Sequence, residues 1–328
     1  MTTSKEMGFI SAEKMMKNRY FSLSDWMLPL LVVLTAAVAG FIQPRFFTVS
    51  NAVNLACQLA PLLIISLGQA VAVIRGGLDL SLSSAMSLAG VAGVMIMDQY
   101  GVAAGLLAML ITGTMTGAVS GFIIAFFKTS PLVITLGMLS VAQAIALILS
   151  GGVPIYDVPA AYVQAVGYDT LLGLPMLVWI AAALTVMVAV LLKFTLFGRY
   201  VYAIGSNVSA ASKSGINVRF VTVLVYMVSG FCAGTGAIVL TAWTSSAQPI
   251  AAANLTLQSL AAVVLGGVAL AGGAGNIRQV ITGVVVLTLL SNVMNMIGVS
   301  AYYQTLAVGI VIILAVVLDR LRRRGTEN

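Results

Sequence analysis

The stretch Met176–Leu192 reads MLVWIAAALTVMVAVLL and carries no charged side chain. Apolar residues occupy every face of this segment, and the run Leu306–Leu318 has the same character. A strand of a membrane β-barrel would instead alternate apolar and polar residues over about 10 positions. Because a peptide backbone cannot leave its hydrogen-bonding groups unpaired in lipid, these segments must be α-helices. The two runs therefore predict an all-α membrane protein.

The composition of the whole chain supports this prediction. Of the 328 residues, 60% are hydrophobic and only 8% are charged, which leaves too few polar groups to cover a soluble fold. A membrane-spanning helix needs roughly 20 mainly apolar residues. The chain contains about ten such stretches, so we expect a polytopic protein with about ten transmembrane helices. The expected spans are residues 27–42, 52–74, 84–97, 102–126, 131–149, 171–192, 220–241, 255–271, 279–297 and 304–318.

The charged residues give these spans an orientation. Short cytoplasmic loops of membrane proteins carry an excess of Lys and Arg. With the N-terminus inside, every Lys and Arg except Arg45 falls on the cytoplasmic side, whereas Asp98, Asp157 and Asp169 fall outside. The net charge of +7 needs no nucleic-acid partner, because these basic residues lie where anionic lipid headgroups are found. We expect both termini in the cytoplasm and three parts: an N-terminal segment (1–26), one transmembrane domain (27–318) and a basic tail (319–328).

Glycines recur at every fourth position in two of the predicted spans. Such spacing lets helix backbones approach closely in lipid. It therefore indicates a compact helix bundle. The glycines are Gly113, Gly117 and Gly121 in the fourth span, and Gly230 and Gly234 in the seventh.

The predicted spans contain few groups that could do chemistry. By the boundaries above, all nine Asp and Glu lie outside the spans or at their edges, and the chain has no histidine. Cys57 and Cys232 fall within apolar runs, so we interpret them as small hydrophobic residues rather than a disulfide or metal ligands. A proton- or cation-coupled carrier usually keeps ionisable groups at membrane depth. We expect no metal site, no catalytic residue and an energy source on another chain.

The sequence also lacks the phosphate-binding motif of an ATPase. The segment Gly272–Gly275 is glycine-rich but lacks the Lys and Ser or Thr of a phosphate-binding loop. Polar residues inside the spans can either line a solute path or hydrogen-bond neighbouring helices, and both interpretations stay open. These residues are Gln58, Gln69, Gln143, Ser291, Asn292 and Asn295.

Residues 194–218 form the longest internal cytoplasmic segment, and it is too polar to span a membrane. Asn207 or Ser206 can cap a short helix over about Val208–Ser214, and Gly215 suits a left-handed exit from it. This helix would either dock into a groove on a partner or serve as a solvated connector. The small side chains available for docking are Ala210, Ala211 and Ser214.

Residues Arg75–Ser84 read RGGLDLSLSS. The paired Gly76 and Gly77 free the backbone, and the Ser and Asp side chains, including Asp79, can cap the next helix. A pore-lining break at membrane depth and a plain cytoplasmic turn explain these residues equally well.

These two segments and a third resemble the ribose-type permeases of bacterial ABC importers. The sequence GGLDLS at Gly76–Ser81 is similar to the family's G-G-[IL]-D-L-S motif, with Ser83 where a Gly is common. The sequence LGGVALAGGAG at Leu265–Gly275 is similar to the family's L-G-G…G-G-x-G stretch, although Asn276 and Ile277 depart from the usual ending. The loop is similar to F-G-R…A-[IV]-G-x-N…A-A…S-G-I through Phe197, Gly198, Arg199, Ala203, Ile204, Gly205, Asn207, Ala210, Ala211, Ser214, Gly215 and Ile216. The resemblance covers nearly the whole chain.

The resemblance implies a permease of the bacterial inner membrane that moves a solute from periplasm to cytoplasm. It implies an ATPase partner with two fused nucleotide-binding domains that holds ATP and Mg, so this chain itself binds no cofactor. It also implies a periplasmic solute-binding protein and a second permease copy, identical or paralogous. The ATPase-coupling loop is then carried by Phe197, Gly198, Arg199, Gly205, Asn207, Ala210, Ala211, Ser214 and Gly215.

We expect the cargo to be a neutral, sugar-like solute such as ribose or another monosaccharide, because the spans carry no counter-ion for a charged one. The autoinducer-2 signal, a nucleoside and an amino acid are alternatives, as is an ATP-independent carrier or channel. A membrane enzyme is disfavoured, since no His, Cys/His or carboxylate pair converges in the sequence. The candidate translocation pathway comprises Gly76, Gly77, Asp79, Ser81, Gln69, Gln143, Asn292 and Asn295.

Overall fold

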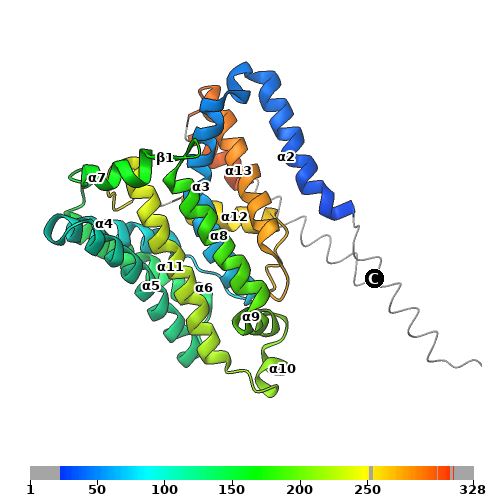
Figure 1. The fold of residues 1–328 in the computed structure, drawn as a ribbon. Coiled ribbons are helices and arrows are strands. Elements are labelled where there is room, and N and C mark those ends of the chain that lie inside the picture. Colours follow the sequence, from blue (N-terminus) through cyan, green and yellow to red (C-terminus); the bar gives the residue numbers. More distant parts are fainter. Residues whose placement is uncertain (1–22, 251–253, 301, 311–312, 314–328) are drawn as a thin grey trace, which may run out of the picture.

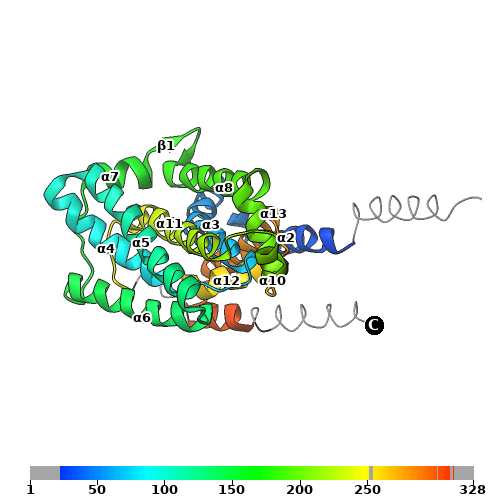
Figure 2. The same ribbon diagram turned by 90° about the horizontal axis from the view of Figure 1, so that it is seen from below.

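The computed structural model describes residues 23–250, 254–300, 302–310 and 313, which form a bundle of α-helices (Figures 1 and 2). The expected basic tail 319–328 and most of the segment 1–26 lie outside these residues, as does part of the span 304–318. The helices are α2 (Leu23–Ile42), α3 (Val49–Ile74), α4 (Leu82–Tyr100), α5 (Val102–Phe127), α6 (Pro131–Ser150), α7 (Ala160–Tyr162), α8 (Met176–Phe194), α9 (Leu196–Ser206), α10 (Val208–Lys213), α11 (Val218–Thr244), α12 (Leu255–Leu265) and α13 (Ile277–Met296). Shorter elements are the 3₁₀ turn η2 (Pro44–Phe47), the π-helical turn η3 (Val163–Tyr168) and an antiparallel pair, β1 (Thr170–Leu171) with β2 (Leu174–Pro175).

Six helices in the described part of the chain are long and apolar enough to cross a membrane, namely α3, α5, α6, α8, α11 and α13. Two shorter apolar helices cover Val32–Ile42 and Leu255–Leu265. The prediction of a polytopic all-α membrane protein is therefore confirmed. The count of ten spans stays a prediction.

Two of the expected spans differ most from the helices in the structure. The span expected at 171–192 begins at Met176, because Leu172 and Gly173 take positive φ angles and turn the preceding residues into the β1–β2 hairpin. The span expected at 255–271 ends at Leu265, and an irregular segment follows that contains several glycines with positive φ. Backbone angles of this kind are ordinary for glycine and incompatible with a continuing right-handed helix.

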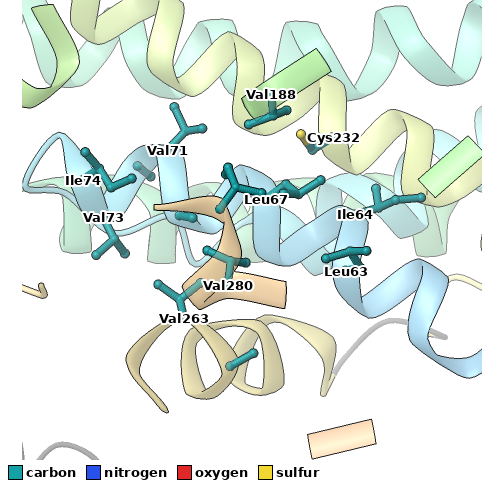
Figure 3. Packing of buried hydrophobic residues seen from close by; sticks show 14 of the residues in the cluster. Leu63, Ile64, Leu67, Val71, Val73, Ile74, Val188, Cys232, Val263 and Val280 are labelled. Atoms are coloured by element: carbon teal, nitrogen blue, oxygen red, sulfur yellow. The ribbon is translucent and has the colours of Figure 1, made fainter. Parts of the chain in front are cut away.

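Helix α3 lies at the centre of the bundle, enclosed by α8, α11, α12 and α13. Every residue from Ala60 to Ile74 is buried. Figure 3 shows Val188 of α8 and Cys232 of α11 on one side of α3, with Val263 of α12 and Val280 of α13 on the other. A helix that is apolar on all faces is stable only where other helices or lipid surround it. Here its surroundings are protein.

The glycine pattern predicted to bring two spans together does so between α5 and α11. A Cβ atom added to Gly113 would lie 2.5 Å from the carbonyl oxygen of Gly230, and one added to Gly234 would lie 2.6 Å from that of Met109. A Cβ on Gly117 would overlap the carbonyl oxygen of Tyr226. The two backbones are therefore in direct contact, and the predicted close packing is confirmed.

This contact predicts a strong effect of Gly117→Leu. The leucine would separate α5 from α11, and overpacking of this kind lowers the free energy of unfolding by about 1–3 kcal/mol. The measurement is the thermal unfolding midpoint of the detergent-solubilised protein. Gly137→Leu on α6 is the matched control, since nothing lies within 4 Å of a Cβ at Gly137. An equal fall in both variants would contradict the packing argument.

Candidate functional site

The segment that follows α3 folds back along α11. Gly76 takes a φ angle of +87°, which a residue with a Cβ rarely adopts. The amide of Gly77 donates to the carbonyl of Ala72 at 2.9 Å, so α3 ends in a tight turn. The hydroxyl of Tyr226 on α11 then donates to the carbonyl of Leu78 at 3.3 Å. This turn therefore packs against the side of α11.

Asp79 is the centre of this turn and is 1% exposed. Its Oδ1 accepts hydrogen bonds from the amide of Ser81 at 3.0 Å and from the Ser81 hydroxyl at 2.6 Å, and its Oδ2 accepts one from the Ser229 hydroxyl at 2.7 Å. Ser229 is the twelfth residue of α11, about 17 Å along the helix at 1.5 Å per residue. The carboxylate thus lies beside the middle of a spanning helix.

Asp79 lies outside the spans, as expected, because α3 ends at Ile74 and α4 begins at Leu82. Gly76 is exposed, but Gly77, Asp79 and Ser81–Ser84 are buried, and this burial favours a break inside the bundle over a plain turn. Its place relative to the membrane stays a prediction. The paired glycines let the chain turn inward, and the hydroxyls of Ser81 and Ser229 provide the hydrogen bonds that a buried carboxylate requires.

Two helices begin next to each other in the interior of the bundle. The amide of Ser83, in the first turn of α4, donates to the hydroxyl of Thr256 in the first turn of α12 at 2.9 Å. Both residues are buried. Helix α12 has 11 residues, so it is about 16 Å long and reaches across only about half of a bilayer core. Discontinuous helices that start inside the bundle are a common way to build a solute path.

Three motifs from different parts of the sequence meet in a second cluster, which we name the glycine junction: Gly76, Gly205, Gly272 and Gly273. The amide of Gly273 donates to the carbonyl of Ile74, the last residue of α3, at 2.8 Å. A Cβ on Gly205 would overlap that same carbonyl, and a Cβ on Gly272 would lie 2.8 Å from the Cα of Gly76. The ends of α3 and α9 and the segment after α12 are therefore in backbone contact.

The loop expected at 194–218 consists of α9 and α10, at one end of the molecule in Figure 1. As predicted, the Asn207 side chain caps α10 by accepting from the amide of Ala210 at 2.9 Å, and Gly215 exits with a φ of +83°. Ala210 and Ser214 are exposed, whereas Ala211 packs into the core. A partner could therefore contact the first two residues and not Ala211.

Other residues of the predicted loop serve local structure. The Thr195 hydroxyl caps α9 by accepting from the amide of Gly198 at 3.3 Å, and Arg199 is exposed. The Tyr202 hydroxyl donates to the carbonyl of Gly275 at 2.8 Å. Burial raises the pKa of the Tyr202 phenol, which keeps it a neutral donor. Tyr202 therefore ties α9 to the segment that contains Gly272 and Gly273.

The remaining residues of the predicted pathway do not gather at one place. The side-chain amides of Asn292 on α13 and Asn51 on α3 form two hydrogen bonds of 3.2 Å with each other, an arrangement that joins helices. Gln143 donates to the carbonyl of Pro249, and Asn295 accepts from Gln304 at 2.6 Å. The fourth residue, Gln69, is fully buried. Neither the nitrogen nor the oxygen of its side-chain amide has a hydrogen-bond partner among the described residues.

Several residues of the site were not anticipated from the sequence, namely Thr222, Tyr226, Ser229 and Thr256. Each is a polar residue near or within an apolar run. Only its hydrogen bond to another helix or segment in the folded bundle identifies it as part of the site. Arg75 provides one such contact, donating to the hydroxyl of Thr222 at 2.7 Å. Among the described residues, no three Cys, Asp or Glu side chains lie where they could share a metal ion.

Comparison with known proteins identifies the family of this chain. Residues 51–316 match the family described as "Branched-chain amino acid transport system / permease component". The ribose import permease protein RbsC of Haemophilus influenzae is 33% identical over 88% of this chain and 90% of its own length. RbsC of Bacillus subtilis is 37% identical (86% and 88% of the two chains), and the L-arabinose transport system permease protein AraH of Escherichia coli is 32% identical (92% of both).

No solved structure gives a significant match. The family match and these relatives each cover most of the chain. The chain therefore belongs to this family of transport-system permease components, as a multi-pass membrane permease of a bacterial ABC importer and not an enzyme.

Proposed function

We propose that this permease carries a neutral monosaccharide from the periplasm to the cytoplasm. The relatives are named for ribose and L-arabinose, which supports a sugar as cargo. The family description instead names branched-chain amino acids, whose carboxylate would need a cationic partner on its way. The described Lys and Arg residues lie in connecting segments or at the ends of the long helices. Their position favours a neutral solute.

The observation that supports transport driven from outside the bundle is the glycine junction. It connects the exposed α9–α10 loop to the end of α3, and so to the buried turn at Asp79. Packed helices with direct backbone contact move as rigid units. A displacement of the loop is therefore passed on to the interior of the bundle.

The proposed arrangement has ten membrane spans with both termini in the cytoplasm. The segment 1–26 and the tail 319–328 are then cytoplasmic, and residues 27–318 form the permease domain. The glycine junction and the loop 194–218 lie on the cytoplasmic side. The distribution of Lys and Arg supports this orientation.

The proposed partners are those of a complete importer. An ATPase with two fused nucleotide-binding domains holds ATP and Mg and docks on α10, chiefly at Ala210 and Ser214. A periplasmic binding protein delivers the solute, and a second permease, identical or paralogous, completes the channel. Closure of the ATPase on ATP displaces α9 and α10, and the bundle changes between outward-open and inward-open states.

Transport of a sugar is tested with the complete importer in sealed vesicles, with binding protein outside and ATP inside. We expect radiolabelled D-ribose or L-arabinose to accumulate and leucine to remain outside, because Lys and Arg among the described residues lie in connecting segments or at the ends of the long helices. Accumulation must stop when ATP is omitted. Uptake of leucine, or uptake by the permease alone under an ion gradient, would disprove the proposal.

Docking of the ATPase is tested with Ala210→Asp. The change leaves α10 helical, since an acidic residue is favourable near a helix N-terminus, but it places a charge on the proposed contact. We expect the amount of permease in the membrane to stay constant while ATP-driven uptake falls by about tenfold, the equivalent of about 1.4 kcal/mol. Ala210→Ser is the matched control. Normal import by Ala210→Asp would exclude α10 as the docking element.

Transmission through the glycine junction is tested with Gly205→Val. The side chain would overlap the carbonyl of Ile74 and push α9 away from α3. We expect the ATPase to remain bound while uptake falls by about tenfold or more, since an overpacked contact shifts the backbone. Copurification of the ATPase and vesicle uptake are measured together. Gly137→Val, in open space on α6, serves as control, and wild-type uptake by Gly205→Val would show that the junction transmits nothing.

A further inference from the structure

A small cavity lies between α4, α11 and the connector that follows α11. It has a volume of about 10 Å³, and its polar lining consists of Ser87, Thr241, Ser246 and Gln248. This volume is close to the minimum that holds one water molecule or one hydroxyl group. Thr241 is three residues from the end of α11, whereas Arg75, beside the glycine junction, contacts Thr222 near its start. The cavity is therefore at the other end of α11 from the junction.

Ser87 supplies the first evidence that this cavity is a binding site. Its side chain is 5% exposed and lines the cavity, and its hydroxyl has no hydrogen-bond partner among the described residues. A buried hydroxyl without a partner is unfavourable, because it has lost its bonds to water. A hydroxyl group placed in the cavity that Ser87 lines could supply the missing hydrogen bond.

The neighbouring groups have the chemistry of a carbohydrate site. The Gln248 amide donates to the Ser246 hydroxyl at 3.1 Å, and the Ser246 hydroxyl donates to the carbonyl of Thr244 at 3.2 Å. Gly90 leaves the Thr241 hydroxyl accessible, since a Cβ there would lie 3.0 Å from it. No Lys, Arg, Asp or Glu lines the cavity. Hydroxyl and amide groups both donate and accept, as do the hydroxyls of a sugar.

The connector that closes the cavity is held from two sides. Ala247 forms an isolated antiparallel bridge with Ile155, in which each amide donates to the other residue's carbonyl at 2.9 Å. Gln143 of α6 donates to the carbonyl of Pro249. With the connector in this position, the cavity has room for one hydroxyl group and not for a sugar ring. Displacement of residues 245–250 from α4 would enlarge the cavity without exposing a charged group.

We propose that this cavity is a solute contact site of the permease, in which the Ser87 hydroxyl binds a hydroxyl group of a neutral carbohydrate. The inference rests on the proposed function and adds a specific residue to it. Ser87 is then a determinant of cargo selection within the membrane domain. The site is distinct from the buried turn, where the carboxylate of Asp79 is already occupied by Ser81 and Ser229.

The first test is uptake of D-ribose and L-arabinose by Ser87→Ala in the complete importer, with the loaded binding protein at saturation. We expect uptake to fall by about tenfold, the equivalent of about 1.4 kcal/mol, because the variant loses the hydroxyl that contacts the sugar. Ser120→Ala is the matched control: Ser120 of α5 is also buried with an unpaired hydroxyl, but it does not line the cavity. Uptake by this control should equal that of the wild type.

The second test measures contact directly. Ser87→Cys in the complete importer is treated with a small methanethiosulfonate reagent, and D-ribose or L-arabinose should slow the labelling while leucine should not. The native Cys57 and Cys232 are buried, and the wild-type importer gives the background labelling.

The outcomes separate the two proposals. Wild-type import of neither sugar overturns the proposed function, and the contact site with it. Given normal wild-type import, three results would overturn the contact site alone. They are unchanged uptake by Ser87→Ala, equal losses in Ser87→Ala and Ser120→Ala, or a Ser87→Cys variant that is not labelled during ATP-driven transport or whose labelling neither sugar slows.

Discussion

Every backbone amide and carbonyl inside a membrane must find its hydrogen-bond partner within the protein. A continuous helix meets this requirement by itself, but α3 ends at Ile74 and α4 starts at Leu82 within the same bundle. The intervening turn is possible only because the amide of Gly273 reaches the Ile74 carbonyl and Thr256 reaches the amide of Ser83. The irregular segment between α3 and α4 thus depends on hydrogen-bond partners from distant parts of the chain.

Glycine makes these partnerships possible because it lets one backbone contact another. Between α5 and α11 the contact joins two long helices, and at the glycine junction it joins the α9–α10 loop to the end of α3. Both contacts exclude a Cβ atom, so the parts they connect cannot slide independently. In the function we propose, this rigidity lets a movement of the α9–α10 loop reach the interior of the bundle.

Whether a buried polar group has a hydrogen-bond partner within the chain distinguishes a structural role from a functional one. Asn292 pairs with Asn51, and Asp79 has three hydrogen bonds, so these groups are satisfied within the chain. Ser87 is buried beside a cavity and has no partner in the described part of the chain. A satisfied group stabilises the bundle, whereas an unsatisfied one beside a cavity can bind solute, because a hydroxyl of the cargo removes its desolvation cost.

The sequence alone was enough to predict an all-α polytopic protein, close backbone approach at the glycines of α5 and α11, and a capped short helix at α10 with Asn207 as one of two candidate caps. These are local properties, since hydropathy, glycine spacing and capping depend on residues a few positions apart. Only the tertiary structure could decide that Asp79 lies beside Ser229, that Ala211 is buried, and that three glycine motifs meet. Those contacts join residues far apart in the sequence, and no local pattern records which helix faces become neighbours when the bundle packs.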